Sequence, residues 1–370
     1  MSNKFTEAVQ KTRDFYAMKK GAKIVQHEFG YYVMDRWIKE GHIKDQNELM
    51  ELWGTDEKGM EYFWNLGWCE TQFMPWFETK VLEDRGDYEL VQDNAGRGVL
   101  CFKGRRHGFM PEYVTHPVTD RDSWERNVKW RMDPNSPGRK PLNDQEDEKI
   151  KKVSAQGSMV GQTLIGGYMY LRSLVGPEGA LYLFYDDPDL IHEMMETWFN
   201  LADATIARNQ AVHELDELFL AEDICYNHGP LISPDMMREF LFPYYQQLIT
   251  NLKARQPKKG LPFLQIDTDG DCRPVIPVYQ ELGANYFSPF EVASGCDVVE
   301  LRKQYPELLM RGGIDKRELA KGKDAIDRMV DRIMPFMTAQ GGFIPMCDHG
   351  VPDEVDFEDY LHFRKRLKEF

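Results

Sequence analysis

Asp267 and Asp269 are separated by one residue in the run DTDGD at residues 267–271. If the run continues an extended strand, the carboxyl groups of Asp267 and Asp269 lie on one face. Two carboxylates this close either bind a cation or raise one another's pKa. A calcium loop of the EF-hand type is excluded, because its Gly is sixth and a Glu is twelfth, whereas Gly270 is fourth and Val278 is twelfth. An aspartate-rich turn that caps the next helix explains the run equally well.

A second candidate is His349, which follows the apolar residues 343–347 and precedes Gly350. Histidine carries protons near neutral pH and is a common metal ligand. A lone histidine is more often structural. Here, however, it stands where a loop over a pocket would begin, which favours a role in chemistry.

Further candidates follow other apolar runs. Glu222 and Asp223 come directly after the run LFLA, and this acidic pair could bind the polar end of a substrate or form salt bridges. Aromatic side chains could line an apolar pocket beside them, and the candidates are Tyr31, Tyr226 and Phe290. Core packing explains these aromatic residues as well.

The candidates share a position in the expected fold, at the ends of apolar runs separated by helical patterns. Strands are expected at 218–221, 262–267, 284–291, 307–315 and 341–350. Strands that alternate with helices indicate a parallel sheet. No GxGxxG fingerprint follows the first strand, which favours a (β/α)8 TIM barrel over a dinucleotide-binding fold. Catalytic residues of such barrels lie at the carboxyl ends of the strands.

The amino-terminal third shows a different pattern. Residues 22–30 (AKIVQHEFG) predict a first strand and residues 157–167 another. Between them, residues 80–110 contain short β-rich pieces broken at Gly86 and Gly96, which predicts an antiparallel β meander inserted in the barrel. Residues 1–370 are expected to form one barrel domain.

The composition limits the partners and the compartment. A net charge of −15 argues against nucleic acid or an anionic membrane as a partner. Six scattered cysteines without a CxxC pair indicate reduced thiols in a cytosol. The amino terminus lacks the apolar core of a secretory signal, and no apolar run approaches the ~20 residues of a membrane helix. We therefore expect a soluble cytoplasmic protein; homodimerisation is left open.

Four segments together resemble the uroporphyrinogen-decarboxylase-like superfamily. They are AEDICYNHGPLISPDMMREFLFPYY, LQIDTDGDCRPVIPVYQELGANYFSPFE, LLMRGGIDKREL and GGFIPMCDHGVPDEVDFEDY. The resemblance runs from about Gly157 to the end and implies a (β/α)8 barrel, because the decarboxylase and cobalamin-dependent methyltransferases share that fold. The arginine-rich motif with which the decarboxylase binds substrate carboxylates is missing from residues 22–37. The resemblance is therefore closest in character to the methyltransferase branch.

Thiol-specific methyltransferases of this superfamily hold zinc with His-x-Cys and a late Cys. Asp267, Asp269 and His349 fall at the matching positions, so the resemblance implies a harder, more acidic site there. The three residues are expected either to bind zinc or to move protons without a metal.

The resemblance implies methyl transfer from a small methylated donor, preferably a methoxylated aromatic compound, to a corrinoid protein. The corrinoid, which becomes methylcobalamin, would be carried by that partner, since a corrinoid-binding Asp-x-His-x-x-Gly motif is missing here. His349 is expected to act as the acid or a metal ligand, with Asp267 and Asp269 as co-ligands or orienting partners. One alternative is a decarboxylase of uroporphyrinogen or a smaller carboxylated substrate. The other is a barrel that binds a ligand without catalysis.

Overall fold

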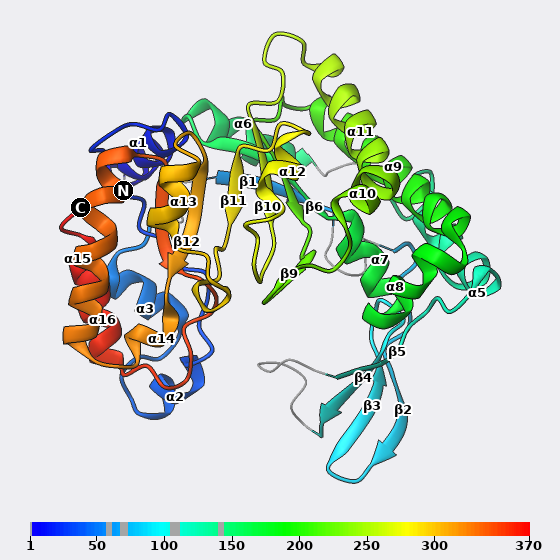
Figure 1. The fold of residues 1–370 in the computed structure, drawn as a ribbon, viewed down its shortest axis with the longest axis horizontal. Helices are drawn as coiled ribbons and strands as arrows, with labels where there is room; N and C mark the ends of the chain where they lie inside the picture. The colour runs from blue at the N-terminus through cyan, green and yellow to red at the C-terminus, as the bar shows by residue number, and fades with distance from the viewer. Residues whose placement is uncertain (1, 57–60, 67–72, 104–111, 140–143) are drawn as a thin grey trace.

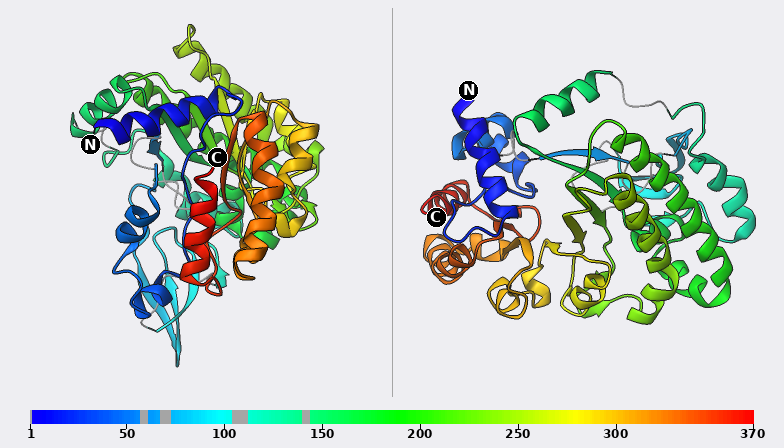
Figure 2. Two further views of the ribbon diagram at one scale, coloured as in Figure 1. Left: turned by 90° about the vertical axis from the view of Figure 1, so that its left-hand side faces the viewer. Right: turned by 90° about the horizontal axis from the view of Figure 1, so that it is seen from above.

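The computed structural model describes residues 2–56, 61–66, 73–103, 112–139 and 144–370. A sheet of seven parallel strands, in the order β1-β6-β7-β10-β11-β12-β13, forms its centre (Figure 1). These strands are β1 (Glu61–Asn65), β6 (Met159–Ile165), β7 (Glu217–Ala221), β10 (Phe263–Asp267), β11 (Tyr286–Ser288), β12 (Leu309–Ile314) and β13 (Phe343–Cys347). The sheet curves into the wall of a (β/α) barrel with helices on its outer side, which confirms the predicted fold class (Figure 2).

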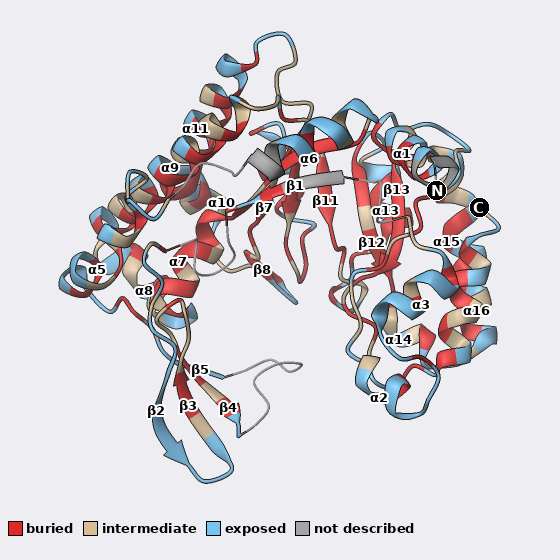
Figure 3. Ribbon diagram, turned by 180° about the vertical axis from the view of Figure 1, so that it is seen from behind, coloured by how far each residue is buried: buried red, intermediate tan, exposed pale blue. Residues whose placement is uncertain are grey.

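Burial on both faces explains the composition of the strands. Every residue of β13 is buried, and so are four of the five residues of β7. Parallel strands covered by helices on one side and by the barrel interior on the other need apolar residues at successive positions. Figure 3 shows this continuous buried layer in the central strands.

The helices alternate with the strands from α6 onward, as in a barrel. The first group is α6 (Asp144–Ala155), α7 (Gly167–Val175), α8 (Pro177–Asp186), α9 (Pro188–Gln210), α10 (Pro234–Met236) and α11 (Phe242–Arg255). The second group is α12 (Ile276–Gln280), α13 (Val298–Gln304), α14 (Lys316–Leu319), α15 (Lys323–Gln340) and α16 (Phe357–Leu367). A π-helical segment (Met237–Leu241) joins α10 to α11, and two short strands, β8 (Cys225–Tyr226) and β9 (Gly229–Pro230), follow β7.

The strand predicted at residues 22–30 is not formed. The segment is irregular, and only an isolated bridge between Tyr31 and Val351 follows it. Side chains take hydrogen bonds that a ladder would use, because Asp56 accepts from the Gln26 amide at 2.8 Å and Arg364 donates to the His27 carbonyl at 3.0 Å. Within the described residues, no ladder therefore joins β13 to β1.

The predicted antiparallel insertion is present. Four strands in the order β2-β3-β4-β5 project from the barrel (Figure 1), and they are β2 (Lys80–Arg85), β3 (Tyr88–Gln92), β4 (Gly98–Phe102) and β5 (Glu112–Thr115). Gly86 adopts a φ of 77° in the first hairpin, a conformation that favours glycine. The last strand ends beyond the predicted boundary at residue 110, and residues 104–111 lie outside the described residues.

The amino-terminal helices complete the barrel. They are α1 (Ser2–Tyr16), α2 (Met34–Lys39) and α3 (Gln46–Trp53), and a further pair, α5 (Arg121–Asn127) and η1 (Lys129–Met132), follows the antiparallel sheet. Phe15 and Tyr16 of α1 pack against Tyr286 and Ile344 of the sheet, so this helix closes the end where the strands begin (Figure 2). No helix among the described residues combines the length and the apolar character that a membrane crossing requires.

Candidate active site

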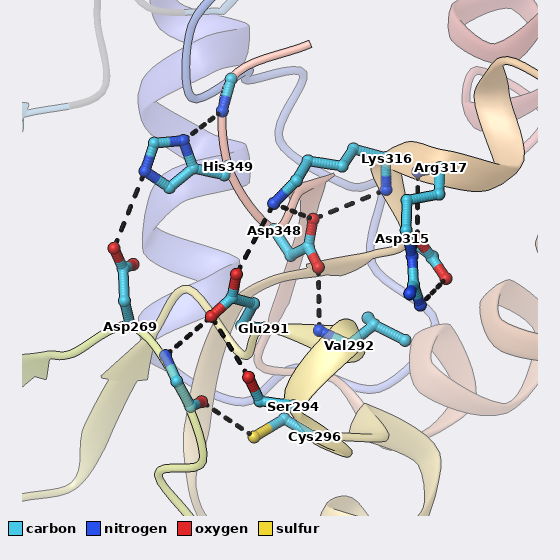
Figure 4. A network of polar contacts seen from close by, with 12 residues as sticks. Asp269, Glu291, Val292, Ser294, Cys296, Asp315, Lys316, Arg317, Asp348 and His349 are labelled. Atoms are coloured by element: carbon cyan, nitrogen blue, oxygen red, sulfur yellow. Dashed lines mark hydrogen bonds and ion pairs between the residues drawn. The ribbon is translucent and has the colours of Figure 1, made fainter. Parts of the chain in front are cut away.

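The carboxyl ends of the parallel strands bring Asp269 and His349 together. Asp269 follows β10 and His349 follows β13, and His349 Nε2 lies 3.7 Å from Asp269 Oδ2 (Figure 4). The two residues are eighty positions apart in the chain. Their approach follows from the fold, since parallel strands end at one side of the barrel.

The contacts of His349 fix the orientation of its ring. Nδ1 accepts a hydrogen bond from the Gly350 amide at 2.9 Å and contacts the Tyr32 hydroxyl at 2.7 Å. Because the amide can only donate, Nδ1 is the acceptor, and the neutral ring carries its proton on Nε2, which faces Asp269. The rings of Phe29 and Tyr32 lie 4.7 and 5.6 Å from the imidazole. Both rings are about half exposed and offer flat apolar surface at the mouth.

Asp269 stands among other acidic groups. Partial burial raises the pKa of Asp269 to about 8, and the carboxylates of Asp223, Asp267 and Glu291 contribute to this rise. Lys316 opposes it. Although 44% of the Asp269 side chain is exposed, three nearby negative charges disfavour a fourth. These effects favour the protonated form of Asp269 at neutral pH.

His349 shifts in the other direction. Burial lowers the pKa of His349, and the positive charge of Lys316 lowers it further. At neutral pH the imidazole is uncharged. The two pKa values therefore shift in opposite directions, which favours a protonated Asp269 beside a neutral His349, whereas the sequence had suggested His349 as the acid.

Asp267 points toward the barrel interior. Its Oδ1 accepts a short hydrogen bond from the Ser288 hydroxyl, which in turn accepts from the Gln265 amide at 2.8 Å. Burial raises the pKa of Asp267 to about 6, while the Ser288 hydrogen bond opposes the rise. Above pH 6 this carboxylate is mostly ionised and adds negative charge beneath Asp269.

A network around Lys316 connects the loops that follow the four strands β10, β11, β12 and β13 (Figure 4). Lys316 Nζ lies 3.3 Å from Asp348 Oδ1 and 3.8 Å from Glu291 Oε1. Glu291 Oε2 accepts from the Gly270 amide at 2.9 Å, and Asp348 Oδ2 accepts from the Val292 amide at 2.8 Å. These contacts hold the Asp269 turn against the neighbouring loops.

Asp223 and Tyr226 lie on the same side of the mouth. Asp223 has a φ of 42° and forms a short ion pair with Arg172 of α7. Tyr226 is 46% exposed, and its carbonyl accepts from the Asp271 amide at 2.8 Å, beside the turn that carries Asp269. Both side chains can therefore contact a bound molecule.

Glu222 does not reach the mouth, contrary to the prediction that it binds substrate. Its side chain is fully buried, and its two oxygens accept from the Tyr168 amide at 2.9 Å and the Tyr245 hydroxyl at 2.5 Å. Burial raises the pKa of Glu222 to about 7. Gly166 packs so closely that a Cβ there would lie 2.3 Å from a Glu222 oxygen. Glu222 therefore anchors the start of α7.

Two predicted pocket residues belong to the core instead. Phe290 is fully buried, with a φ of 59° that turns the chain after β11. The Tyr31 hydroxyl contacts the Tyr360 hydroxyl at 3.0 Å and accepts from the Trp53 indole at 3.1 Å, and the partly buried ring packs against the core. Its neighbour Tyr32 takes the place expected for Tyr31.

Sequence reasoning missed four residues of this site, which are Phe29, Tyr32, Glu291 and Lys316. Glu291 ends the predicted strand at 284–291, and Lys316 comes one residue after the predicted strand at 307–315. Position after a strand, which singled out Asp269, was a sufficient reason to include both. Phe29 and Tyr32 stand at the end of the strand predicted at 22–30, and of the aromatic residues there only Tyr31 was predicted to line the pocket.

The predicted zinc ligands do not form a metal site as they lie. In the part of the chain that the structure describes, no three His, Cys, Asp or Glu side chains are arranged to hold a metal ion. Asp267 accepts from Ser288, and Nδ1 of His349 accepts from Gly350. Only the Asp269–His349 pair remains, which is fewer than the three protein ligands of a catalytic zinc.

Comparisons with known proteins agree with the fold. The sequence model of the family described as Uroporphyrinogen decarboxylase (URO-D) matches residues 146–370. A structure described as a methyltransferase from Methanosarcina mazei shares 14% identity and a TM-score of 0.56, with 98% of each chain covered. A structure described as a "Putative Vitamin-B12 Independent Methionine Synthase" from Listeria monocytogenes shares 12% identity over 94% of this chain and 98% of that chain, and its TM-score of 0.38 supports no argument. A search of curated protein sequences found no match.

Proposed function

The chain belongs to the uroporphyrinogen decarboxylase (URO-D) family, whose model covers more than half of its length, and we propose that it is a methyltransferase. The proposed reaction moves a methyl group from a methoxylated aromatic compound to a corrinoid carried by a partner protein. The observation that supports it most is the position of Asp269, whose pKa is raised, beside His349 where the strands end.

In the proposed reaction this chain supplies a proton donor and need not supply a nucleophile. The corrinoid of the partner protein would supply a reduced cobalt that attacks the methyl carbon. The C–O bond then breaks, and the departing phenolate oxygen must take a proton. Asp269 gives up that proton, so a phenol leaves and an aspartate carboxylate remains.

The neighbours of Asp269 support both halves of this step. Before transfer, burial and the negative charge of Asp223, Asp267 and Glu291 favour the protonated form of Asp269. After transfer, the Nε2–H of His349 faces the new carboxylate and can hydrogen-bond to it. The same three acidic groups favour uptake of a new proton from solvent, which restores the acid.

The exposed aromatic side chains suit a flat donor. Phe29 and Tyr32 both contact the His349 ring, and Tyr226 lies beside the Asp269 turn. Aromatic rings that pack offset or edge to face contribute about 0.5–1.5 kcal/mol beyond the buried area. An aromatic methyl ether could therefore place its oxygen near Asp269 while its ring packs against these side chains.

The neighbouring structure described as a methyltransferase also supports the proposal, because it has this fold over nearly its full length. The name of the family supports a second candidate, a decarboxylase in which Asp269 protonates the carbanion left after loss of carbon dioxide. The acidic surroundings of Asp269 disfavour a substrate with many carboxylates, so this candidate requires a small one.

The test uses free cob(I)alamin as the methyl acceptor under anaerobic conditions, with a panel of methoxylated phenols and benzoates. We expect methyl–cobalt absorbance and an equal amount of the phenol. Asp269→Asn should slow the reaction ~10²–10⁴-fold, the usual contribution of a general acid. Asp186→Asn, at an exposed aspartate of α8, is the matched control and should not change the rate.

Failure of every donor to methylate cobalt would overturn the proposal. Release of carbon dioxide from a small aromatic acid, lost in Asp269→Asn, would establish the decarboxylase instead. Binding of a methoxylated compound without turnover, and with equal affinity in both variants, would indicate a barrel that binds without catalysis.

A further inference from the structure

Two buried thiols join the loops behind the site. Cys272 follows the turn of Asp269, and Cys296 follows Glu291 and the short helix η3 (Val292–Ser294). Their sulfur atoms lie 3.7 Å apart. Cys296 Sγ also donates to the Gly270 carbonyl at 3.5 Å, as Figure 4 shows. The thiol pair therefore lies where the Asp269 loop and the Glu291 loop meet.

The distance between the thiols is close to that of a disulfide. A disulfide requires sulfur atoms about 2.05 Å apart, so each sulfur must move by less than about 1 Å. Both residues lie outside helices and strands, where a side-chain rotation breaks no ladder. The hydrogen bond from Cys272, with help from Arg273, lowers the pKa of the Cys296 thiol, which makes Cys296 the better nucleophile.

We propose that Cys272 and Cys296 form an oxidative modification site, at which hydrogen peroxide produces an intramolecular disulfide that inactivates the barrel. The Cys296 thiolate attacks one oxygen of the peroxide, and the O–O bond breaks. Cys296 becomes a sulfenic acid, and the hydroxide that departs takes up the proton lost by the thiol and becomes water. The Cys272 thiol then attacks the Cys296 sulfur, and water leaves. In total, two thiols and one peroxide give one disulfide and two water molecules.

The disulfide would act on the site through Gly270. When the Cys296 sulfur turns to Cys272, it gives up its hydrogen bond to the Gly270 carbonyl. The amide of Gly270 donates to Glu291, and its carbonyl accepts from Cys296. Both backbone groups of the residue after Asp269 are therefore bonded to the loop of Glu291 and Cys296. A displacement of the acid by about 1 Å can reduce a rate on the order of 10²-fold. This loss of activity rests on the proposed function, whereas formation of the disulfide does not.

The burial of both sulfurs predicts selectivity by size. The two thiols are at most 1% exposed, so hydrogen peroxide should reach them, whereas oxidised glutathione should not. The full chain is treated with each oxidant, and its disulfides are mapped by peptide mass spectrometry. We expect one Cys272–Cys296 disulfide with peroxide, none with oxidised glutathione, and full reversal by dithiothreitol.

Two variants decide the result. Cys272→Ser should abolish the disulfide and protect methyl transfer from peroxide, whereas Cys101→Ser, at a buried cysteine of the antiparallel sheet, should behave as the parent protein. A parent protein in which peroxide leaves the two thiols unlinked would overturn the proposal. So would a mapped disulfide that leaves the rate unchanged, since the inactivation would then be wrong. If no methyl transfer is observed at all, the mapping still tests the thiol pair by itself.

Discussion

Methyl transfer should be lost as the pH rises through the pKa of Asp269. A general acid works only while it holds its proton, so activity is present below that pKa and disappears above it. With a pKa of about 8, about 90% of Asp269 is protonated at pH 7 and about 9% at pH 9. The rate of the chemical step should therefore fall about tenfold between these two pH values.

The environment of Asp269 determines how much of it is protonated at pH 7. An aspartate at its usual value of 3.8 would be protonated to only ~0.06% at pH 7, so burial, together with the neighbouring carboxylates, raises the population of the acid on the order of 10³-fold. Asp267→Asn removes one of the negative charges that raise the pKa of Asp269. In the plot of rate against pH, we expect the activity of Asp267→Asn to fall at lower pH than that of the parent protein.

The assay is a single-turnover measurement of methyl–cobalt absorbance from pH 6 to 10 in overlapping buffers. Reaction of cob(I)alamin with methyl iodide, without protein, corrects for any pH dependence of the acceptor. Asp186→Asn should keep the midpoint of the parent protein, because its carboxyl is exposed on α8. A profile that stays flat from pH 7 to 9, or an unchanged midpoint in Asp267→Asn, would refute the role of Asp269 as a stored acid.

Three further results are expected. The raised pKa of Asp269 means that the folded protein holds a proton that the unfolded chain releases, so Asp269 favours folding less as the pH rises from about 4 to about 8. Asp269→Asn should therefore raise the melting temperature more at pH 8 than at pH 4. Equal shifts at the two pH values would contradict this. Glu222→Ala leaves two buried donors without an acceptor and should lower the free energy of unfolding by about 2–5 kcal/mol in urea titrations, whereas Glu222→Gln should cost less. Tyr32→Phe removes the hydroxyl contact with His349 and should reduce kcat with little change in melting temperature, while Tyr31→Phe should do the reverse; identical effects of the two variants would contradict the assignment.

The sequence predicted the fold best where the strands are buried on both faces. The apolar runs at 218–221, 262–267 and 341–350 coincide with β7, β10 and β13 to within a few residues, and the helices between them fix the parallel direction. The segment at 22–30 was also predicted to be a strand but forms none. Its backbone bonds to the side chains of Asp56 and Arg364, and hydrogen bonds to distant side chains leave no pattern in a local sequence.

For the candidate site, the position of a residue directly after a predicted strand identified residues near the site. The sequence did not show which of these side chains face the mouth of the barrel. Asp269 and His349 follow strands and meet. Glu222 also follows a strand, yet a buried tyrosine and a helix amide draw it into the core. Which of two adjacent residues faces the mouth depends on backbone angles such as the φ of 59° at Phe290, and those angles are set by the packing of the whole barrel.

Helix α1 has a consequence for the order of events in the proposed reaction. It closes the end of the barrel where the strands begin, with Phe15 and Tyr16 packed among the interior side chains and the Tyr16 hydroxyl bonded to Glu217. A small donor and a large partner protein must then share the opposite opening. The donor has to enter first, the partner covers it, and the phenol leaves only after the partner has gone. Excess partner protein should therefore slow the cycle by trapping the product, a form of inhibition that the acid–base groups alone would not predict.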